Sequence, residues 1–394
     1  MLDNASFTLR DPNVIANLYS YYTLFRELDP AHWDERLRAW ICTDYETCRH
    51  VLRSPEIFTA DPRRLGIEIP DVMLTLQVLD PPEHAPIRQL MAAAFRAQDM
   101  PEFERTVRCV VRECITQLPA HSSVDLTTQL IGPIALRSVC GFLGVTVPDL
   151  DWFVEVSDRL VLGMDGGYVP EAIPGAVRAR EELSTLVATW IEEDVPNGLV
   201  GFLLRAQRAE NVSRTLLVNT VRATLHAGHS STSRFMENAV LICLQNPGIR
   251  AELRQLSGTE AMRTAVDELM RFDGPVQAGS RFCVVDTVLR GRKIRRGEMV
   301  TVILGAANHD PQVFDHPELP DLQRKPNPHL GFGRGIHSCL GAGMALLVTQ
   351  IFLEELLNVY PHASLIDEPK RRISGTVRGV ASIPVVLLPA HSVV

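Results

Sequence analysis

A short glycine-rich loop near the C-terminal end of the chain carries a cysteine. Residues 331–341 read GFGRGIHSCLG, and an apolar, helix-like pattern occupies 340–359. A helix that starts directly after Cys339 would place its free backbone N–H groups and the positive end of its dipole near the sulfur. Both favour the thiolate over the thiol and lower the cysteine pKa. The glycines let the backbone approach a flat ligand closely, and Phe332 can lie against such a ligand.

Three other interpretations of this loop were weighed. A buried cysteine beside a flexible loop is the plainest one. A dinucleotide-binding loop is excluded because Ile336 and Ser338 stand where the third glycine is required, and the preceding segment 324–330 is no strand. A metal site built on His337 and Cys339 finds no second pair of ligands in the sequence.

The string F-G-x-G-x-H-x-C-x-G, filled by Phe332 through Gly341, resembles the haem-binding loop of the cytochrome P-450 monooxygenases. Six of its ten positions are fixed, which makes it a specific motif. The resemblance implies that Cys339 binds the iron of haem b (iron protoporphyrin IX), with Phe332, Gly333 and Gly341 around the cofactor. An axial thiolate pushes electron density to the iron and favours O–O cleavage.

Further motifs of the same family follow in order along the chain. His84 and Arg88 match a His and an Arg that bind haem propionates, and their i, i+4 spacing puts both donors on one helical face. Arg281 and His337 match two further propionate ligands. Without the family, an exposed His and Arg pair would be the default interpretation.

Glu268 and Arg271 match the family's E-x-x-R pair, which the resemblance implies to be buried and structural behind the cysteine loop. The third member of that network is usually an arginine. The corresponding segment 318–321 has Leu and Pro at the central positions, so another group must take this place. His309 and Arg324 are the two candidates, and the sequence does not decide between them.

The predicted long helix over 213–245 contains Ala227-Gly228-His229-Ser230-Ser231-Thr232, where the family has A-G-x-[D/E]-T-T. In the family, the small residues open a groove over the iron, the acid relays protons and the first alcohol hydrogen-bonds oxygen. Ser230 stands at the acid position and Ser231 at the alcohol position. A serine relays a proton only through water or a neighbouring group, because it is no acid near neutral pH.

Three hypotheses accommodate this departure. Ordered water, with His229 or a substrate hydroxyl, completes the relay and the enzyme hydroxylates normally. Alternatively, the enzyme is driven by peroxide. In the third hypothesis it catalyses ring formation, coupling or group transfer. A haem protein that senses a small molecule without turnover is a more distant alternative.

The family layout also implies a substrate pocket. Its segments are mainly apolar, which suits a medium-to-large lipophilic molecule as substrate beside O2. The candidate lining residues are Leu65, Ile67, Ile69, Met73, Leu74, Leu162, Met164, Tyr168, Thr224, Ala227, Gly228, Pro275–Ala278 and Gly375–Val377.

Electrons must come from outside the chain, because it has no flavin or nicotinamide segment. The resemblance implies a ferredoxin and a ferredoxin reductase as partners. Arg105, Arg108 and Arg112 share one helical face and form a candidate basic docking patch with Arg324, Lys325 and Arg334. A plain solvated face is the alternative.

The elements that must position these residues form a mainly helical chain with small sheets. Helical periodicity covers 101–118, 176–194, 213–245 and 340–359, while strand patterns occur at 36–41, after 276 and in the tail. Segments 60–77 and 163–173 are predicted loops. We therefore expect an α+β cytochrome P-450 fold, a single triangular helical domain over 1–394 with β-rich N- and C-terminal parts.

Composition supports a folded chain, with 46% hydrophobic and 22% charged residues among 394. The net charge of -8 gives no reason to expect nucleic acid or an anionic membrane as partner. We see no secretory signal and no apolar run of spanning length, so a cytoplasmic protein without a membrane anchor is expected. None of the eight cysteines forms a C-x-x-C pair, and most should be reduced and buried.

Overall fold

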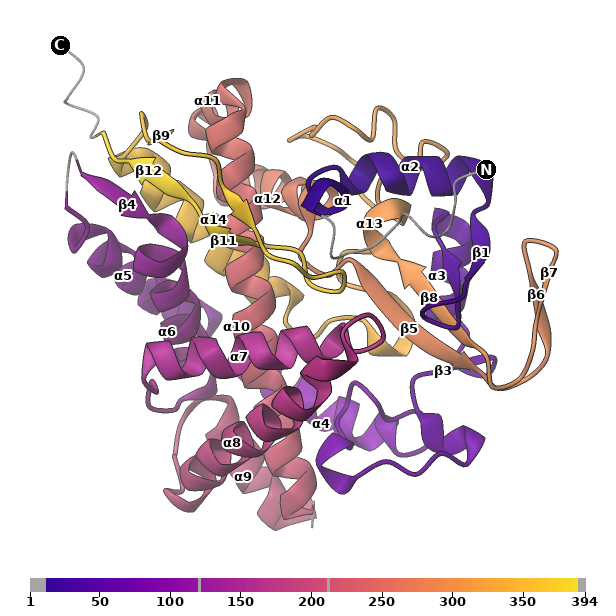
Figure 1. Ribbon diagram of the computed structural model, residues 1–394. Coiled ribbons are helices and arrows are strands. Elements are labelled where there is room, and N and C mark those ends of the chain that lie inside the picture. The colour runs from indigo at the N-terminus through magenta and orange to yellow at the C-terminus, as the bar shows by residue number, and fades with distance from the viewer. Residues whose placement is uncertain (1–11, 120–121, 211–212, 389–394) are drawn as a thin grey trace.

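The computed structural model describes residues 12–119, 122–210 and 213–388, and it has a helical body beside a group of small sheets (Figure 1). The long helix α10 (Arg214–Gln245) crosses the middle of this body. It is buried on nearly all sides, which explains why its sequence has a weak amphipathic pattern. The predicted mainly helical fold with small sheets is confirmed.

The helices that surround α10 begin where the sequence offers capping side chains. Asp44, Asp99, Asp149 and Ser213 accept hydrogen bonds from the first-turn N–H groups of α3, α5, α7 and α10. The longer helices besides α10 are α2 (Leu18–Leu28), α3 (Tyr45–Arg53), α4 (His84–Arg96), α5 (Met100–Thr116), α6 (Gly132–Leu143), α7 (Leu150–Met164), α8 (Ile173–Glu192), α9 (Gly198–Glu210), α11 (Pro247–Gln255), α12 (Thr259–Asp273) and α14 (Ala342–Val359). The short helices are α1 (Pro12–Ala16) and α13 (Leu304–Ala307).

The largest sheet has five strands in the order β1-β2-β8-β5-β3. Their bounds are β1 (Ala31–Asp34), β2 (Ala39–Cys42), β8 (Met299–Ile303), β5 (Ala278–Cys283) and β3 (Phe58–Thr59). Strands β2 and β8 are parallel and the other pairs are antiparallel. The sheet thus joins the N-terminal segment to a segment 260 residues later in the chain, through pairs such as Ile41 with Thr301.

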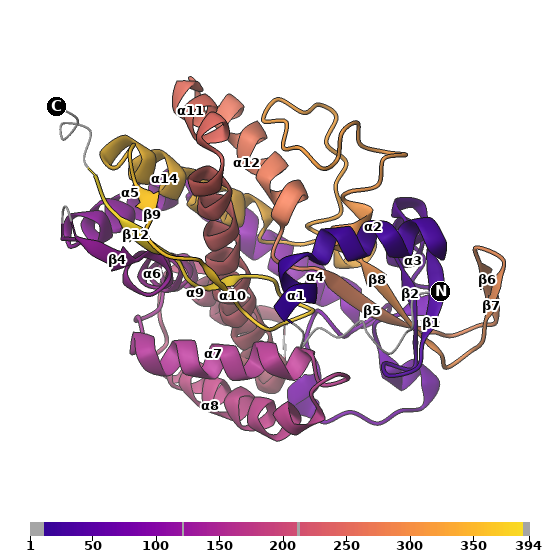
Figure 2. The same ribbon diagram turned by 45° about the horizontal axis from the view of Figure 1, so that its top comes forward.

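The remaining strands form small sheets and a hairpin. The C-terminal strands β11 (Val380–Ser382) and β12 (Pro384–Val386) pair with β10 (Lys370–Arg371) and with β4 (Ser123–Asp125) and β9 (Ser364–Leu365), respectively. Strands β6 (Thr287–Leu289) and β7 (Arg292–Ile294) form a projecting hairpin. Figure 2 shows that the chain between α13 and α14 loops out with little regular structure, and this segment includes the cysteine loop.

Two predicted boundaries are wrong by a few residues. The first strand was expected to include Leu37, but β2 starts at Ala39 because Arg38 adopts a left-handed conformation with φ 50° in the preceding turn. Helix α14 begins at Ala342, so it does not start directly after Cys339. This helix is long and apolar enough to span a membrane, yet 67% of the window is buried within the protein, as in a core helix.

A buried carboxylate fixes the irregular segment that leads to the cysteine loop. Glu268 is fully buried and accepts hydrogen bonds from Arg271 Nη2 at 2.8 Å and from Arg324 Nε at 3.1 Å. Arg271 also donates to the carbonyl oxygens of Asn308 and Pro317. Of the two candidates, Arg324 therefore supplies the third member of the network.

His309 does not contact this carboxylate in any hydrogen bond of the described residues. Its Nδ1 lies 3.0 Å from the carbonyl oxygen of Gly305, and its ring packs against Tyr19. Burial, with a contribution from Arg271, lowers the pKa of His309 to about 3, so its ring is neutral. Arg324 was also expected in a surface patch, and that expectation is wrong because its side chain is buried on Glu268.

Arg324→Ala should lower the free energy of unfolding by about 3 kcal/mol, because it leaves the buried Glu268 carboxylate short of one cation. Urea unfolding of the holoprotein measures this. The matched control is Lys325→Ala, whose exposed pair with Glu260 should contribute less than about 0.5 kcal/mol. Equal losses for the two variants would contradict the assigned role of Arg324.

Candidate functional site: a cysteine loop, a cationic cluster and one face of α10

The cysteine loop is a tight turn held by its own backbone. The N–H of Cys339 donates to the carbonyl oxygen of Phe332 at 2.9 Å, and the N–H of Gly333 donates to that of Leu330 at 2.8 Å. Gly335 has φ 76°, and a Cβ there would lie 2.4 Å from the carbonyl oxygen of Leu52 in α3. Only glycine combines that backbone conformation with so close an approach to α3.

The Cys339 side chain is exposed, whereas six of the other cysteines are buried. Desolvation by the surrounding loop raises the pKa of Cys339, while hydrogen bonds from the N–H groups of Gly341 and Ala342 and the charge of Arg88 lower it. The backbone donors that the sequence indicates therefore act in the predicted sense. Desolvation is the larger effect, so the net direction of the pKa is upward.

Four predicted cofactor-binding side chains lie close together beside this loop. The rings of His84 and His337 are 4.7 Å apart, and His337 Nε2 lies 2.8 Å from Asp80 Oδ1. Arg88 Nη2 donates to the carbonyl oxygen of Ser338 at 2.6 Å, which braces the cysteine loop from α4. The charge of Asp80 also acts on Arg281 in β5, so segments from four regions of the chain converge here.

This cluster has unused capacity to bind an anion. His84 Nε2 is buried and has no hydrogen-bond partner among the described residues. Burial, followed by the charges of His337 and Arg88, lowers the pKa of His84 to about 4, so its free nitrogen can be a neutral donor. Asp80 is the carboxylate that acts on His84, Arg281 and His337 among the described residues. Donors of this kind suit the carboxylates of a haem, and the exposed Cys339 sulfur suits its iron.

One face of α10 differs from the rest of that helix. Thr224, Ala227, Gly228 and Ser231 are partly exposed, while Leu225, His226, His229, Ser230 and Thr232 between them are buried. The partly exposed residues follow helical spacing and share a face. A Cβ at Gly228 would come within 2.7 Å of Val139 in α6 and 3.5 Å of Met344 in α14, so the glycine also permits close helix packing.

The two serines of α10 have different surroundings. Ser231 Oγ donates to the carbonyl oxygen of Ala227 at 2.7 Å, which is the local hydrogen bond expected for a hydroxyl in a loosened helix. Ser230 is buried, and its carbonyl oxygen accepts hydrogen bonds from Ser233 Oγ at 3.2 Å and Arg234 Nη1 at 3.1 Å. Arg234 in turn donates to Asp158 of α7 at 2.8 Å.

His229 packs away from the partly exposed face. Its ring contacts Phe153 of α7 edge-on, with centroids 4.8 Å apart, and neither ring nitrogen has a partner among the described residues. Burial, with smaller effects of Arg234 and His226, lowers the pKa of His229 to about 3. The ring is therefore neutral near pH 7 and offers no acidic proton.

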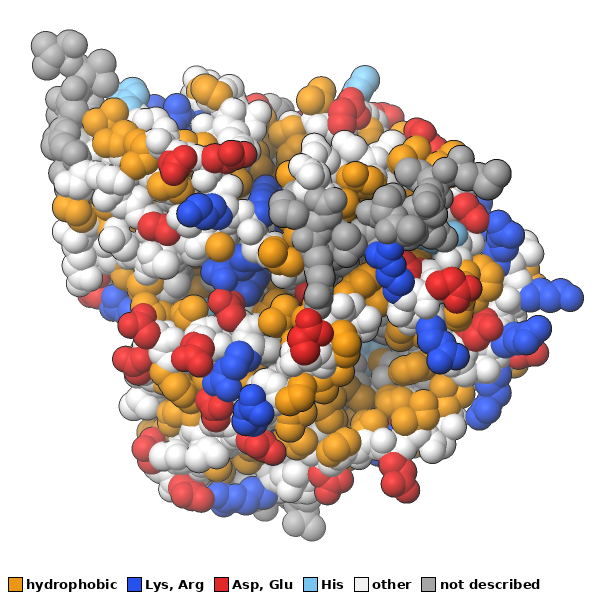
Figure 3. Space-filling model, viewed as in Figure 1, with side chains coloured by type: hydrophobic (Ala, Val, Ile, Leu, Met, Phe, Trp, Pro, Cys, Tyr) orange, Lys and Arg blue, Asp and Glu red, His pale blue; other side chains and the backbone are white. Residues whose placement is uncertain are grey.

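A cavity of about 430 Å³ opens between the large sheet, α2 and the turn that follows α7. Of the predicted pocket residues, it brings together Met164, Tyr168, Ala278, Gly375 and Thr376. The predicted residues of segment 60–77 do not line it, nor do Leu162 and the α10 residues Thr224, Ala227 and Gly228. In Figure 3, hydrophobic side chains border a hollow beside the α7–α8 turn.

Sequence reasoning missed the N-terminal part of this cavity. Tyr22 and Phe25 of α2 and Thr43, which follows β2, contribute to its wall. Only the pairing of β2 with β8 brings this segment to the cavity, and no short sequence signal indicates that pairing.

The predicted basic patch is largely neutralised by nearby carboxylates. Arg105 pairs with Glu102, and Arg108 and Arg112 both pair with Glu355 of α14. Lys325 pairs with Glu260. The patch is therefore a surface of alternating charges, which has a weaker long-range field than its arginines suggest.

Comparison with known proteins agrees with this geometry. The family model described as cytochrome P450, written P-450 here, matches residues 179–385. The mycinamicin IV hydroxylase/epoxidase of Micromonospora griseorubida is 32% identical over 362 residues, covering 88% of this chain and 89% of that protein. The vitamin D3 dihydroxylase of Streptomyces griseolus is 30% identical, covering 88% and 87%.

Solved structures show the same fold over nearly the whole chain. CYP109E1 from Bacillus megaterium in complex with testosterone has a TM-score of 0.88 at 27% identity, covering 96% of this chain and 100% of that one. The fold and these relatives define the class of haem-dependent monooxygenases. The chain belongs to the cytochrome P-450 family and is a haem-binding monooxygenase of that family.

His84→Phe should speed haem loss roughly 10- to 100-fold, because it removes a buried donor to a charged group. The assay follows transfer of haem from the holoprotein to an excess of apomyoglobin. Arg96→Ala, which removes an exposed cation from the same helix, should leave the rate unchanged. An unchanged rate for His84→Phe would show that His84 is no cofactor ligand.

Acid should destabilise the fold through its buried histidines. His226, His229 and His309 have pKa values lowered to about 4, 3 and 3 from an ordinary 6.5, mainly by burial. Below about pH 6.5 only the unfolded chain takes up these protons, so each histidine costs about 1.4 kcal/mol per pH unit until its folded pKa is reached.

His229→Leu should reduce the slope of unfolding free energy against pH between 6 and 4 by about one proton. Urea titrations of the holoprotein across that range measure the slope. His362→Gln, at an exposed position, is the control and should leave the slope unchanged. If the His229→Leu slope matches that of the unaltered protein, the neutral buried state of His229 is contradicted.

Proposed function

We propose that this monooxygenase oxidises a medium-to-large lipophilic small molecule in bacterial secondary metabolism, with O2 and with electrons from a ferredoxin and its reductase. Two observations support the proposal: Arg88 and His337 bring the cationic cluster to the Cys339 loop, and the Ala227–Ser231 face of α10 is partly exposed. We further propose that residues 1–394 act as one domain in the cytoplasm.

The proposed roles follow from the contacts of each residue. Cys339 ligates the iron, and the N–H groups of Gly341 and Ala342 hold part of the thiolate charge. Arg88, Arg281, His84 and His337 bind the propionates, and Arg88 also fixes the loop through Ser338. Phe332 and Gly333 lie in the turn that faces the cofactor. The bound haem supplies oxygen activation at a thiolate-ligated iron.

The proposed distal roles belong to the partly exposed face of α10. Ala227 and Gly228 leave room beside the helix, and Ser231 Oγ can turn its proton from the Ala227 carbonyl toward a polar group next to that face. The carbonyl oxygen of Ser230 accepts hydrogen bonds from Ser233 and Arg234, which fix the position of this residue. Since His229 is neutral and buried, ordered water or a substrate hydroxyl completes the relay.

A peroxide-driven enzyme, or one that forms rings or couples substrates, is the second candidate. The observation that favours it is the absence of an acid at Ser230 in the family pattern. A relative with a biosynthetic name is the biotin biosynthesis cytochrome P-450 of Bacillus subtilis, which is 27% identical to this chain.

The basic docking patch around Arg108 and Arg112 stays the proposed contact with the ferredoxin, although both arginines also pair with Glu355.

Ser231→Ala should lower the amount of product formed per O2 consumed by roughly tenfold, because one proton-donating hydroxyl is lost. The substrate for this assay comes from a screen by Soret shift that starts with testosterone and mycinamicin IV. Product, O2 and released peroxide are measured with ferredoxin and its reductase, and again with added hydrogen peroxide.

Thr232→Val is the matched control, since Thr232 is buried on the adjacent face and should not affect coupling. If Ser231→Ala couples normally and only hydrogen peroxide yields product in both proteins, the peroxide-driven candidate replaces the proposal. If no supply of electrons or peroxide converts any bound ligand, catalysis itself is contradicted.

A further inference from the structure

The cavity lies on the face of the large sheet that is opposite to the Arg281 side chain. Strand pairing places one residue from each of four neighbouring strands in a row across the sheet: His32, Ile41, Thr301 and Ser280. The neighbouring row contains Arg281 and belongs to the other face, because side chains alternate along a strand. The cavity wall is therefore distinct from the cationic cluster beside the cysteine loop.

Most of the cavity wall is apolar. Phe25 of α2, Ile41 of β2, Met299 and Ile303 of β8 and Met164 at the end of α7 all contribute. A cavity of about 430 Å³ with such walls has room for a drug-sized lipophilic group.

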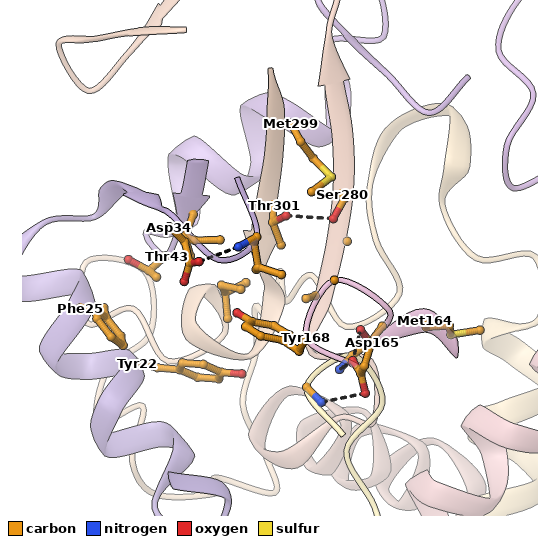
Figure 4. A pocket seen from close by; sticks show the side chains of 18 of the residues that line it. Tyr22, Phe25, Asp34, Thr43, Met164, Asp165, Tyr168, Ser280, Met299 and Thr301 are labelled. Atoms are coloured by element: carbon orange, nitrogen blue, oxygen red, sulfur yellow. Dashed lines mark hydrogen bonds between the residues drawn. The ribbon is translucent and has the colours of Figure 1, made fainter. Parts of the chain in front are cut away.

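Hydroxyl groups give this apolar wall its polar points. In Figure 4, the hydroxyls of Tyr22 and Tyr168 turn toward the space between α2 and the turn after α7. Ser280 and Thr301 share a hydrogen bond of 2.9 Å on the sheet floor. Burial raises the pKa of both tyrosines, so they are neutral donors near pH 7.

Besides the two tyrosines, the titratable side chains that line the cavity are His32 and the carboxylates of Asp34 and Asp165. Asp34 Oδ1 accepts the N–H groups of Arg36 at 2.9 Å and Leu37 at 2.8 Å. Asp165 accepts the N–H and hydroxyl of Thr376 at 2.9 and 2.7 Å. These hydrogen bonds to the Asp34 and Asp165 carboxylates come from uncharged N–H and hydroxyl groups. Among the described residues that line the cavity, none is Lys or Arg.

Two arginines act on tyrosines of the lining without being part of it. The charge of Arg36 acts to lower the pKa of Tyr168, and that of Arg378 acts to lower the pKa of Tyr22. Arg378 is paired with Asp273 at 2.8 Å. A ligand carboxylate in the cavity would thus meet two carboxylates and, among the described lining residues, no Lys or Arg.

We propose that this cavity binds lipophilic molecules whose polar group bears no negative charge, with preference for a cationic group over a neutral oxygen. The inference goes beyond the proposed function, because no residue of the α10 face, the cysteine loop or the cationic cluster is among the described residues that line the cavity. Asp34 and Asp165 repel acids, Tyr22 and Tyr168 donate to a ligand oxygen, and the sheet row supplies the floor.

The test uses three probes with the same alkyl chain and different end groups: dodecyltrimethylammonium, dodecanol and dodecanoate. None of the three bears a primary amine that would bind the iron. Affinity for the holoprotein is measured by calorimetry below the concentrations at which the probes form micelles, and the Soret band is recorded in parallel. The ammonium probe should bind roughly tenfold tighter than dodecanoate, with dodecanol between them.

Two conservative variants locate the effect. Asp34→Asn keeps an oxygen for the N–H groups of Arg36 and Leu37 and should shrink the ammonium-to-carboxylate ratio severalfold. Tyr168→Phe should weaken dodecanol alone. Asp29→Asn removes an exposed carboxylate that pairs with Arg292 outside the cavity, and it should change nothing.

Dodecanoate binding as tightly as the ammonium probe, or a ratio that Asp34→Asn leaves unchanged, would overturn the inference. The proposed function is scored separately by product formation. Turnover without the predicted affinity order would remove the inference and leave the monooxygenase role intact. The affinity order without turnover would leave the cavity assignment and remove the proposed function.

Discussion

A single buried carboxylate, that of Glu268, holds the part of the chain on which the site depends. It is fully buried, and Arg271, Arg324 and the N–H of Asp321 all bind it. Burying one charge without partners costs several kcal/mol, so these contacts form together or fail together. They fix residues 308–330, which have little regular structure, and thereby deliver the cysteine loop to the end of α14.

The position of the Cys339 sulfur sets two opposing effects against each other. Burial disfavours the thiolate, while two backbone N–H groups and Arg88 favour it, and burial prevails. A coordinated metal ion deprotonates a thiol outright, so ligation by iron and the thiolate state come together. The same Arg88 ties the loop to α4, which also carries His84. The helix that carries the proposed propionate donors His84 and Arg88 therefore also holds the loop that carries Cys339, the proposed iron ligand.

Most residues of the candidate site could be predicted from local motifs, because each motif is a fixed spacing of residues within one segment. The cysteine loop, the His84–Arg88 pair and the serines of α10 could be found in this way. Long-range partners could not: Arg324 meets Glu268 across 56 residues, and Tyr22 meets the cavity only through the pairing of β2 with β8. The desolvation that opposes the thiolate at Cys339 could not be predicted either, since it depends on packing that no short segment encodes. The helical fold itself followed from periodicity, with errors confined to the ends of elements such as α14.

The distal side of α10 departs from its family where the proximal side does not, and the consequences for chemistry all presuppose a thiolate on the iron. The most direct measurement is the absorption spectrum of the reduced carbon monoxide adduct, recorded for the unaltered protein and for Cys339→His. The unaltered protein should show the far-red-shifted Soret band of thiolate ligation, and Cys339→His should bind haem without that band. A shifted band that persists in Cys339→His, or its absence from the unaltered protein loaded with haem, would contradict the assignment of Cys339 as the iron ligand.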